Sequence, residues 1–178
     1  MAVEKTNQYL TFTLDEDSFA IEILKVREVL DYEAPTRVPR SPDFLVGVIN
    51  LRGNVVPVVD MRVILGLSAA EISSDSCIII IEINIADENI IVGALADSVQ
   101  KVVDIPASAI GPAPKIGTKL KIEFLTGIGK VGGQFVMILN MDRVLSLEEL
   151  DLVENLTSMA AESFIKEEEM QEETLLEQ

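Results

Sequence analysis

The chain contains no histidine, and this absence removes several classes of enzyme. Ser-His-Asp triads, Cys-His pairs and metal sites with a histidine ligand all require an imidazole. Carboxylates do occur in groups, at Asp15–Asp17 and at Asp87–Glu88, but both groups lie in segments that are typical of hairpin turns. A general acid needs a sheltered position that raises its pKa, and a solvated turn does not provide one. These observations exclude most hydrolase mechanisms and every metal site with a histidine ligand, and we predict that the protein holds no metal. An enzyme built on carboxylates alone stays open, and it would need at least one buried acid with a strongly raised pKa.

Basic residues are scarce. The chain has 14 Lys and Arg against 30 Asp and Glu, which gives a formal charge of −16. Nucleic-acid binding rests on clustered basic residues that neutralise phosphates, so this balance argues against a nucleic-acid partner. From Glu148 to the end of the chain there are eleven acids and one base, Lys166, so this segment carries −10 and the first 147 residues only −6.

The sequence also lacks long apolar runs, tryptophan and paired cysteines. No apolar stretch approaches the roughly 18 residues that a membrane span requires, and the chain does not start with a basic region followed by an apolar run. We therefore expect a cytoplasmic protein without membrane insertion. Its one cysteine, Cys77, cannot form an internal disulfide and is expected to be a buried thiol in a reducing compartment.

What the sequence does contain is an internal repeat. Gly47–Met61 reappears eighty positions later as Gly127–Met141, with apolar residues matching apolar residues at nearly every step. Upstream, Ala20–Asp31 lines up with Gly93–Asp104. A repeat of this kind indicates one structural unit used twice. We predict two subdomains, at about 8–67 and about 76–146, within a domain that covers 6–147.

The repeated segments have the pattern of short strands separated by turns. We expect strands at 8–14, 19–23, 26–31, 46–51, 55–59, 77–85, 89–95, 99–103, 122–128 and 134–139. Five short strands in each half, with turn signals about every ten residues, predict an all-β fold of two small barrels. The sequence leaves open whether strands pass from one barrel to the other.

The segment from Leu147 to the end of the chain has a different pattern. Apolar residues three or four positions apart predict one amphipathic helix that packs across the barrels, and these residues are Leu147, Leu150, Val153, Leu156, Ala160 and Phe164. After them, like charges repel and little can be buried, so 148–178 is expected to form a helix followed by an acidic, partly disordered tail.

One mismatch between the two repeats concerns function. Arg52 lies in a predicted hairpin turn where the second copy has Gly132, so the shared fold does not require an arginine there. An exposed guanidinium near a groove between subdomains is suited to bind a carboxylate or backbone of a partner, although a solvated turn arginine is the alternative. Four valines at matching repeat positions, Val26, Val29, Val99 and Val102, are interpreted either as core or as an exposed binding surface.

Four segments of the chain resemble a known family. Tyr9–Phe12 and Phe19–Val29, followed by Gly47–Gly53 and Val55–Arg62, are similar to the CheW chemotaxis coupling proteins over about residues 6–147. The resemblance implies two five-stranded SH3-like barrels around a hydrophobic core. It also implies a non-enzymatic adaptor, without a cofactor, that links the cytoplasmic tips of chemoreceptors to the regulatory domain of the histidine kinase CheA.

The same resemblance assigns roles to individual positions. It implies that Arg52, Val29, Val99 and Val102 border a groove that receives the helical hairpin of the receptor. It implies that Leu10, Ile23 and Val26 lie on a face of the first barrel that meets the kinase. Glu28 and Gly47 match positions that matter for coupling, without an assigned partner.

Three other functions remain open from the sequence, and the enzyme built on carboxylates alone is one of them. The scaffold is compatible with an adaptor of a non-flagellar chemosensory pathway, and the kinase, receptor class and stimulus are not specified. A small β-barrel that binds an apolar ligand between its subdomains is the alternative from another class, and it predicts an enclosed pocket.

Overall fold

The structure is a computed structural model that describes residues 6–85, 87–112 and 122–176. The strands are β1 (Thr6–Leu14), β2 (Asp17–Glu22), β3 (Val26–Asp31), β4 (Leu45–Leu51), β5 (Asn54–Asp60), β6 (Cys77–Ile85), β7 (Glu88–Ala96), β8 (Ser98–Pro106), β9 (Ile110–Gly111), β10 (Leu125–Val131) and β11 (Gln134–Leu139). The helices are α1 (Met61–Ile64) and α2 (Leu147–Leu176), and 3-10 turns are η1 (Ile23–Lys25), η2 (Ala107–Ala109), η3 (Ile122–Phe124) and η4 (Met141–Arg143). The expected strands are found within a few residues, although the one expected at 122–128 begins at Leu125 because η3 precedes it.

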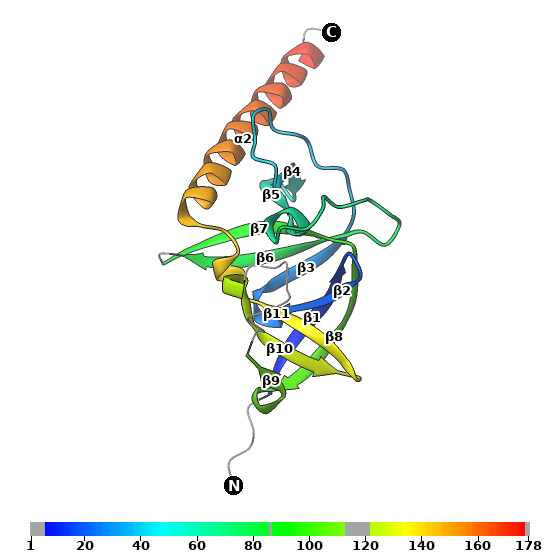
Figure 1. Ribbon diagram of the computed structural model, residues 1–178. Coiled ribbons are helices and arrows are strands. Elements are labelled where there is room, and N and C mark those ends of the chain that lie inside the picture. The colour runs from blue at the N-terminus through cyan, green and yellow to red at the C-terminus, as the bar shows by residue number, and fades with distance from the viewer. Residues whose placement is uncertain (1–5, 86, 113–121, 177–178) are drawn as a thin grey trace.

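The strands form two sheets, as the all-β prediction required (Figure 1). Barrel A has the order β8-β1-β2-β11-β10-β9, and barrel B has the order β3-β6-β7-β5-β4. Each barrel takes strands from both halves of the chain. The hairpin β1–β2 of the first half lies in barrel A with strands of the second half, and β6–β7 lies in barrel B with strands of the first half.

The division into 8–67 and 76–146 therefore describes the repeat in the sequence and not the two barrels. The repeat relates β1 to β6, β2 to β7, β3 to β8, β4 to β10 and β5 to β11. With this correspondence the two barrels have the same strand order, apart from the extra two-residue strand β9. The hairpins β1–β2 and β6–β7 are exchanged between the two halves of the chain. Since β2 pairs in parallel with β11, and β5 pairs in parallel with β7, each hairpin completes the sheet of the other half.

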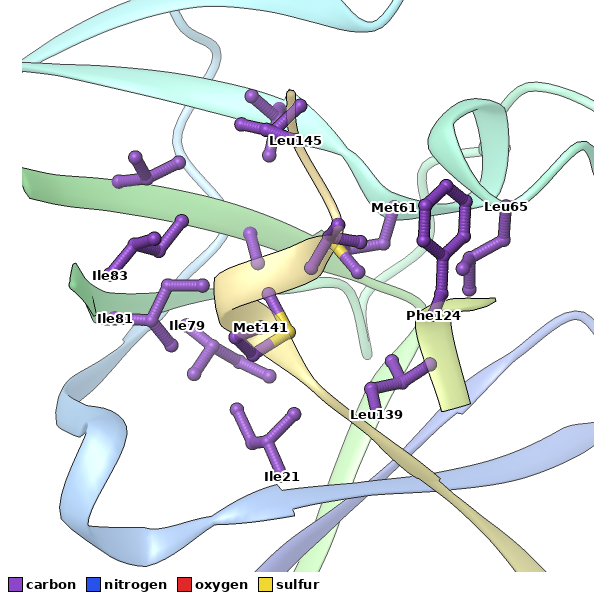
Figure 2. Close-up of a cluster of buried hydrophobic side chains, with 14 of the residues drawn as sticks. Ile21, Met61, Leu65, Ile79, Ile81, Ile83, Phe124, Leu139, Met141 and Leu145 are labelled. Carbon is purple, nitrogen blue, oxygen red and sulfur yellow. The ribbon is translucent and has the colours of Figure 1, made fainter. Parts of the chain in front are cut away.

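Three apolar clusters hold the barrels together. One small cluster, which includes Ala20 and Val136, lies in barrel A, and a second, which includes Val58 and Ile78, lies in barrel B. The largest cluster lies between the barrels and is called the inter-barrel core here. Figure 2 shows it at Ile21 of β2 and Ile79 of β6, whose side chains point toward one another from different sheets. Burial of this interface makes the two barrels one unit.

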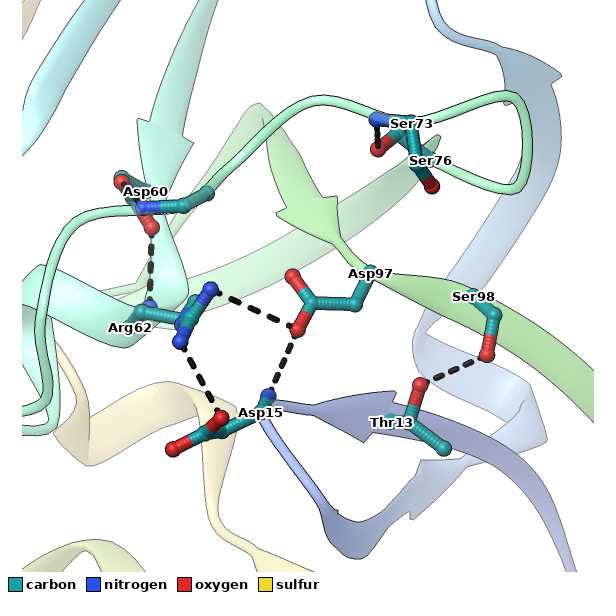
Figure 3. Close-up of polar contacts among 9 residues, drawn as sticks. Thr13, Asp15, Asp60, Arg62, Ser73, Ser76, Asp97 and Ser98 are labelled. Atoms are coloured by element: carbon teal, nitrogen blue, oxygen red, sulfur yellow. Dashed lines mark hydrogen bonds and ion pairs between the residues drawn. The ribbon is translucent and has the colours of Figure 1, made fainter.

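Two polar clusters tie the tip of each exchanged hairpin to the opposite barrel. In the first, which we call the Arg62 cluster, Arg62 lies 3.4 Å from Asp15 in the β1–β2 turn and 3.6 Å from Asp97 after β7 (Figure 3). Asp97 Oδ2 also accepts a 2.6 Å hydrogen bond from the backbone N–H of Asp15. Eighty positions after Arg62, Asp142 forms the second cluster, because it accepts hydrogen bonds from the Asn84 backbone and from Lys25 Nζ.

The helix α2 begins with a reciprocal cap. The N–H of Glu149 donates to Ser146 Oγ, while Glu149 Oε1 accepts from the N–H of Ser146. Leu150 and Val153 are buried in the inter-barrel core, and Leu156 packs against it. The side chains of Leu147 and Phe164, which belong to the predicted stripe, lie outside the described residues.

The segment that was expected to become a partly disordered tail continues as helix to Leu176. In Figure 1 its second half extends beyond the strands. Within the described residues, no helix is long and apolar enough to cross a membrane.

Candidate partner-binding site

Arg52 lies at the tip of the hairpin formed by β4 and β5. The two turn residues, Arg52 and Gly53, have φ values of 50° and 87°, and the corresponding Gly132 and Gly133 have 57° and 82°. A two-residue turn with positive φ at both positions favours glycine, so an arginine here carries a small conformational cost. The fold therefore accepts Arg52 but does not need it, as the repeat suggested.

The side chain of Arg52 is 73% exposed and lies over β3, where its Nη2 is 2.8 Å from Oε2 of Glu28. An exposed pair of this kind stabilises a protein by only about 0–1 kcal/mol. Glu28 thus orients the guanidinium at little energetic cost, and the guanidinium keeps donors for a partner. The structure brings together two residues that the resemblance had assigned separately, Arg52 and Glu28.

An open hollow of about 880 Å³ adjoins this pair. The apolar side chains that line it include Leu51, Val55 and Ile90. One wall comes from barrel B and carries Arg52 and Glu28. The other comes from α2, whose contribution the sequence did not reveal; the residues of this wall are Glu154, Asn155, Thr157 and Ser158. The open form of the hollow does not support the enclosed pocket that a small apolar ligand would need.

The valines lie on the rim of the inter-barrel core. Val29 of the edge strand β3 is paired with Ile79, and Val102 of the edge strand β8 is paired with Leu10, both core residues. Val29 is 41% exposed and Val102 is 47% exposed, while Val99 is partly buried against the core. Each valine thus lies at the edge of the core, and Val29 and Val102 expose apolar surface; their role in binding stays a prediction. Val29 and Glu28 face opposite sides of β3, so the valines lie outside the hollow.

The three residues implied for kinase contact do not share one barrel face. Leu10 is 5% exposed and belongs to the inter-barrel core, so its side chain is not available to a partner. Ile23 and Val26 are half-buried against the same core. The alternation of polar and apolar residues did not predict the burial of Leu10, because alternation does not show which face of β1 the second barrel covers. Beside Ile23, Leu24 in η1 is 90% exposed, and the sequence did not single it out.

Gly47 has a structural reason for being glycine. A Cβ at this position would overlap the carbonyl oxygen of Thr36, whose backbone exchanges two 2.8 Å hydrogen bonds with Val48. The second repeat has the same arrangement, since a Cβ on Gly127 would lie 2.6 Å from the carbonyl oxygen of Gly111. Because both copies keep this glycine and this close approach, a fold requirement accounts for Gly47 without a contact to a partner.

Replacing Gly47 by alanine is expected to lower the free energy of unfolding by about 2 kcal/mol, because the new methyl group displaces the Thr36 segment. Chemical denaturation measures this loss. Gly111→Ala is the matched control, since a Cβ there meets nothing closer than 4.0 Å. Equal stability of the two variants would contradict the steric explanation.

Cys77 is half-buried and not fully buried as expected. Partial burial is the main cause that raises the pKa of its thiol; a hydrogen bond with the Val99 backbone lowers this pKa by a smaller amount, and the carboxylates of Asp31 and Asp75 raise it. The thiol therefore stays protonated at neutral pH and is a poor nucleophile. Among the described residues, no three His, Cys, Asp or Glu side chains gather in a way that could hold a metal ion.

Comparison with known proteins identifies the family. Residues 8–149 match the CheW-like domain. The chain therefore belongs to the CheW-like domain family. It is 37% identical over 148 residues to the chemotaxis protein CheW of Klebsiella aerogenes, covering 83% of this chain and 87% of the relative. It is 33% identical over 143 residues to the chemotaxis protein CheW of Helicobacter pylori, covering 80% of this chain and 83% of the relative.

A solved structure supports the same assignment. The scaffolding protein TtCheW from Thermoanaerobacter tengcongensis superposes with a TM-score of 0.71 at 29% identity, covering 84% of this chain and 92% of that protein. The predicted fold of two SH3-like barrels with a C-terminal helix is thus confirmed. Because the family consists of scaffold proteins, the prediction that the chain is not an enzyme is confirmed as well.

Proposed function

We propose that this protein is a chemotaxis adaptor that couples the cytoplasmic tips of chemoreceptors to the regulatory domain of a CheA-type histidine kinase. It works in the cytoplasm, at membrane-associated receptor arrays. The family assignment and the relatives named as chemotaxis proteins support this proposal. The domain that performs it covers residues 6–147, and 148–178 forms an added C-terminal element.

The observation that carries the proposal is the placement of Arg52. This arginine occupies a backbone position that favours glycine, is largely exposed, and is oriented by Glu28 beside an open hollow. A residue that the fold tolerates but does not require is well suited to a role in binding. We propose that Arg52 and Glu28 contact the receptor tip, and that the exposed valines Val29 and Val102 extend this contact around the edge of β3.

The kinase contact is proposed for the region around η1. Ile23 and Val26 are half-buried there. Leu24 is the exposed apolar side chain of this region, whereas Leu10 is buried in the inter-barrel core. This region belongs to the loop between β2 of barrel A and β3 of barrel B. The adaptor then acts by geometry: it fixes receptor and kinase relative to each other, so that a shift in the receptor changes the population of active kinase. Weak single contacts suffice, because linked contacts in an array give avidity.

The variant Arg52→Gly tests the receptor contact. Since Gly132 occupies the same turn position in the second repeat, glycine is expected to keep or slightly raise the melting temperature. Loss of the guanidinium is expected to weaken binding of a receptor-tip fragment by about tenfold, as judged from charged interface residues. Calorimetry with the receptor tip and separately with the kinase regulatory domain measures both effects, and kinase binding is expected to stay unchanged.

Arg40→Gly is the control for this substitution. Arg40 is also an exposed arginine with a positive φ, of 61°, but it lies outside the hollow. A similar loss of receptor binding in both variants, or no loss in Arg52→Gly, would exclude the proposed role of Arg52.

A further inference from the structure

The hollow beside Arg52 has one wall that the CheW-like domain does not supply. The family match ends at residue 149, within the first turn of α2. The residues of α2 that line the hollow begin at Glu154 and end at Ser158. Burial of Leu150 and Val153 in the inter-barrel core fixes this part of the helix against the barrels. The hollow is therefore a groove with a rigid wall on each side.

The charged groups of the two walls differ in their pairing. On the wall from barrel B, Arg27 is paired with Glu82 and Arg52 is paired with Glu28. On the wall from α2, Glu154 is exposed and forms no ion pair with any residue in 6–85, 87–112 or 122–176. The lining of the groove thus combines guanidinium donors from barrel B, a carboxylate from α2 that has no ion-pair partner among the described residues, and apolar side chains.

We propose that α2 is the second wall of the receptor-binding groove, and that Glu154 binds a basic residue of the receptor tip while Arg52 binds an acidic or backbone group of the same tip. This inference rests on the proposed function. The partner of this groove is a helix. Side chains three and four positions apart lie on one helix face, so a helix can place an apolar residue on Leu51, Val55 and Ile90 and carry one residue of each charge beside it. The order of charges across the groove fixes the direction in which that helix lies.

The test compares two charge reversals on the same helix. Glu154→Lys changes the wall of the groove, and Glu162→Lys makes the same change about two turns later, outside the residues that line it. Both positions are exposed, so both variants are expected to keep the melting temperature of the full chain. Both raise the net charge equally, so any long-range effect on association is shared. The probe is a helical-hairpin fragment of a chemoreceptor tip encoded in the same genome, and calorimetry measures its dissociation constant.

Glu154→Lys is expected to weaken binding by about fivefold to tenfold, and Glu162→Lys by less than twofold. Each basic residue of the fragment is then changed to glutamate, one at a time. One of these changes is expected to restore binding to Glu154→Lys, and this double-mutant cycle identifies the residue that Glu154 contacts. Equal effects of the two lysine variants would overturn the role of α2. If Arg52→Gly still weakens binding in that case, the proposed function stands without α2; if Arg52→Gly has no effect either, the receptor site itself is misplaced.

Discussion

A fragment of residues 1–72 is expected to remain unfolded, although it contains one complete copy of the repeat. In the whole protein β1 pairs with β8, β2 with β11, β3 with β6, and β5 with β7, and every one of these partners lies in the second half. Only the hairpins β1–β2 and β4–β5 remain possible within the fragment. Two-stranded hairpins without a further sheet are marginal in water, and the inter-barrel core draws residues from both halves.

Circular dichroism and a thermal scan of the fragment test this expectation, and the expected result is the absence of a cooperative transition. The positive control is co-expression with residues 73–178, which should give a folded complex. A break between residues 72 and 73 keeps the hydrogen bonds that hold Ala70 to Asp60 and Ser73 to Ser76. Cooperative unfolding of the fragment alone would show that half of the chain can form a barrel without strand exchange.

The second large effect is expected at Arg62. Its side chain is 11% exposed and is the cation of the Arg62 cluster, where it lies between the carboxylates of Asp15 and Asp97. In Arg62→Met the two carboxylates would face each other without a cation, and the tip of the β1–β2 hairpin would lose its tie to barrel B. Breaking a buried pair costs about 3–5 kcal/mol, and the exposure of Asp15 reduces this cost, so a loss of about 3 kcal/mol is expected.

Denaturant titration of Arg62→Met beside Arg27→Met measures this difference. Arg27 forms a surface pair with Glu82, and its loss is expected to change stability by less than about 1 kcal/mol. A cost at Arg62 no larger than the cost at Arg27 would show that the cluster does not stabilise the exchanged hairpin. Suppression of the effect in Asp15→Asn/Arg62→Met, where the repulsion between carboxylates is removed, would support the electrostatic explanation.

The sequence predicted the strands and turns well because both depend on local patterns. The repeat also identified Arg52 correctly as a residue that the shared fold does not need. It did not predict the exchange of hairpins, because the pattern of each strand is the same whichever sheet it joins. Only the contacts between halves, such as Ile21 with Ile79 across the inter-barrel core, decide the partner.

The faces of β3 were not predictable for a related reason. Simple alternation places Val26 and Glu28 on one side of the strand. The register shifts between these two residues, so that Val26 and Val29 face the inter-barrel core and Glu28 faces the opposite side, where it lines the hollow and pairs with Arg52. A bulge of this kind leaves no signal in the amino-acid pattern. The contribution of α2 to the groove was also missed, because the spacing of its apolar residues shows which side is buried but not what lies beside it.

The identical strand order of the two barrels has a consequence for the origin of the chain. A polypeptide with a single copy of the repeat could form all of these strand pairs only by exchanging hairpins with a second, identical polypeptide, as in a symmetric domain-swapped dimer. Duplication and fusion of such an ancestral gene would give the present topology without any change of pairing. Fusion also allows the two copies of the repeat to change independently. One turn can then gain Arg52 while the equivalent turn keeps Gly132, so that a protein with two identical sides becomes one with two different sides.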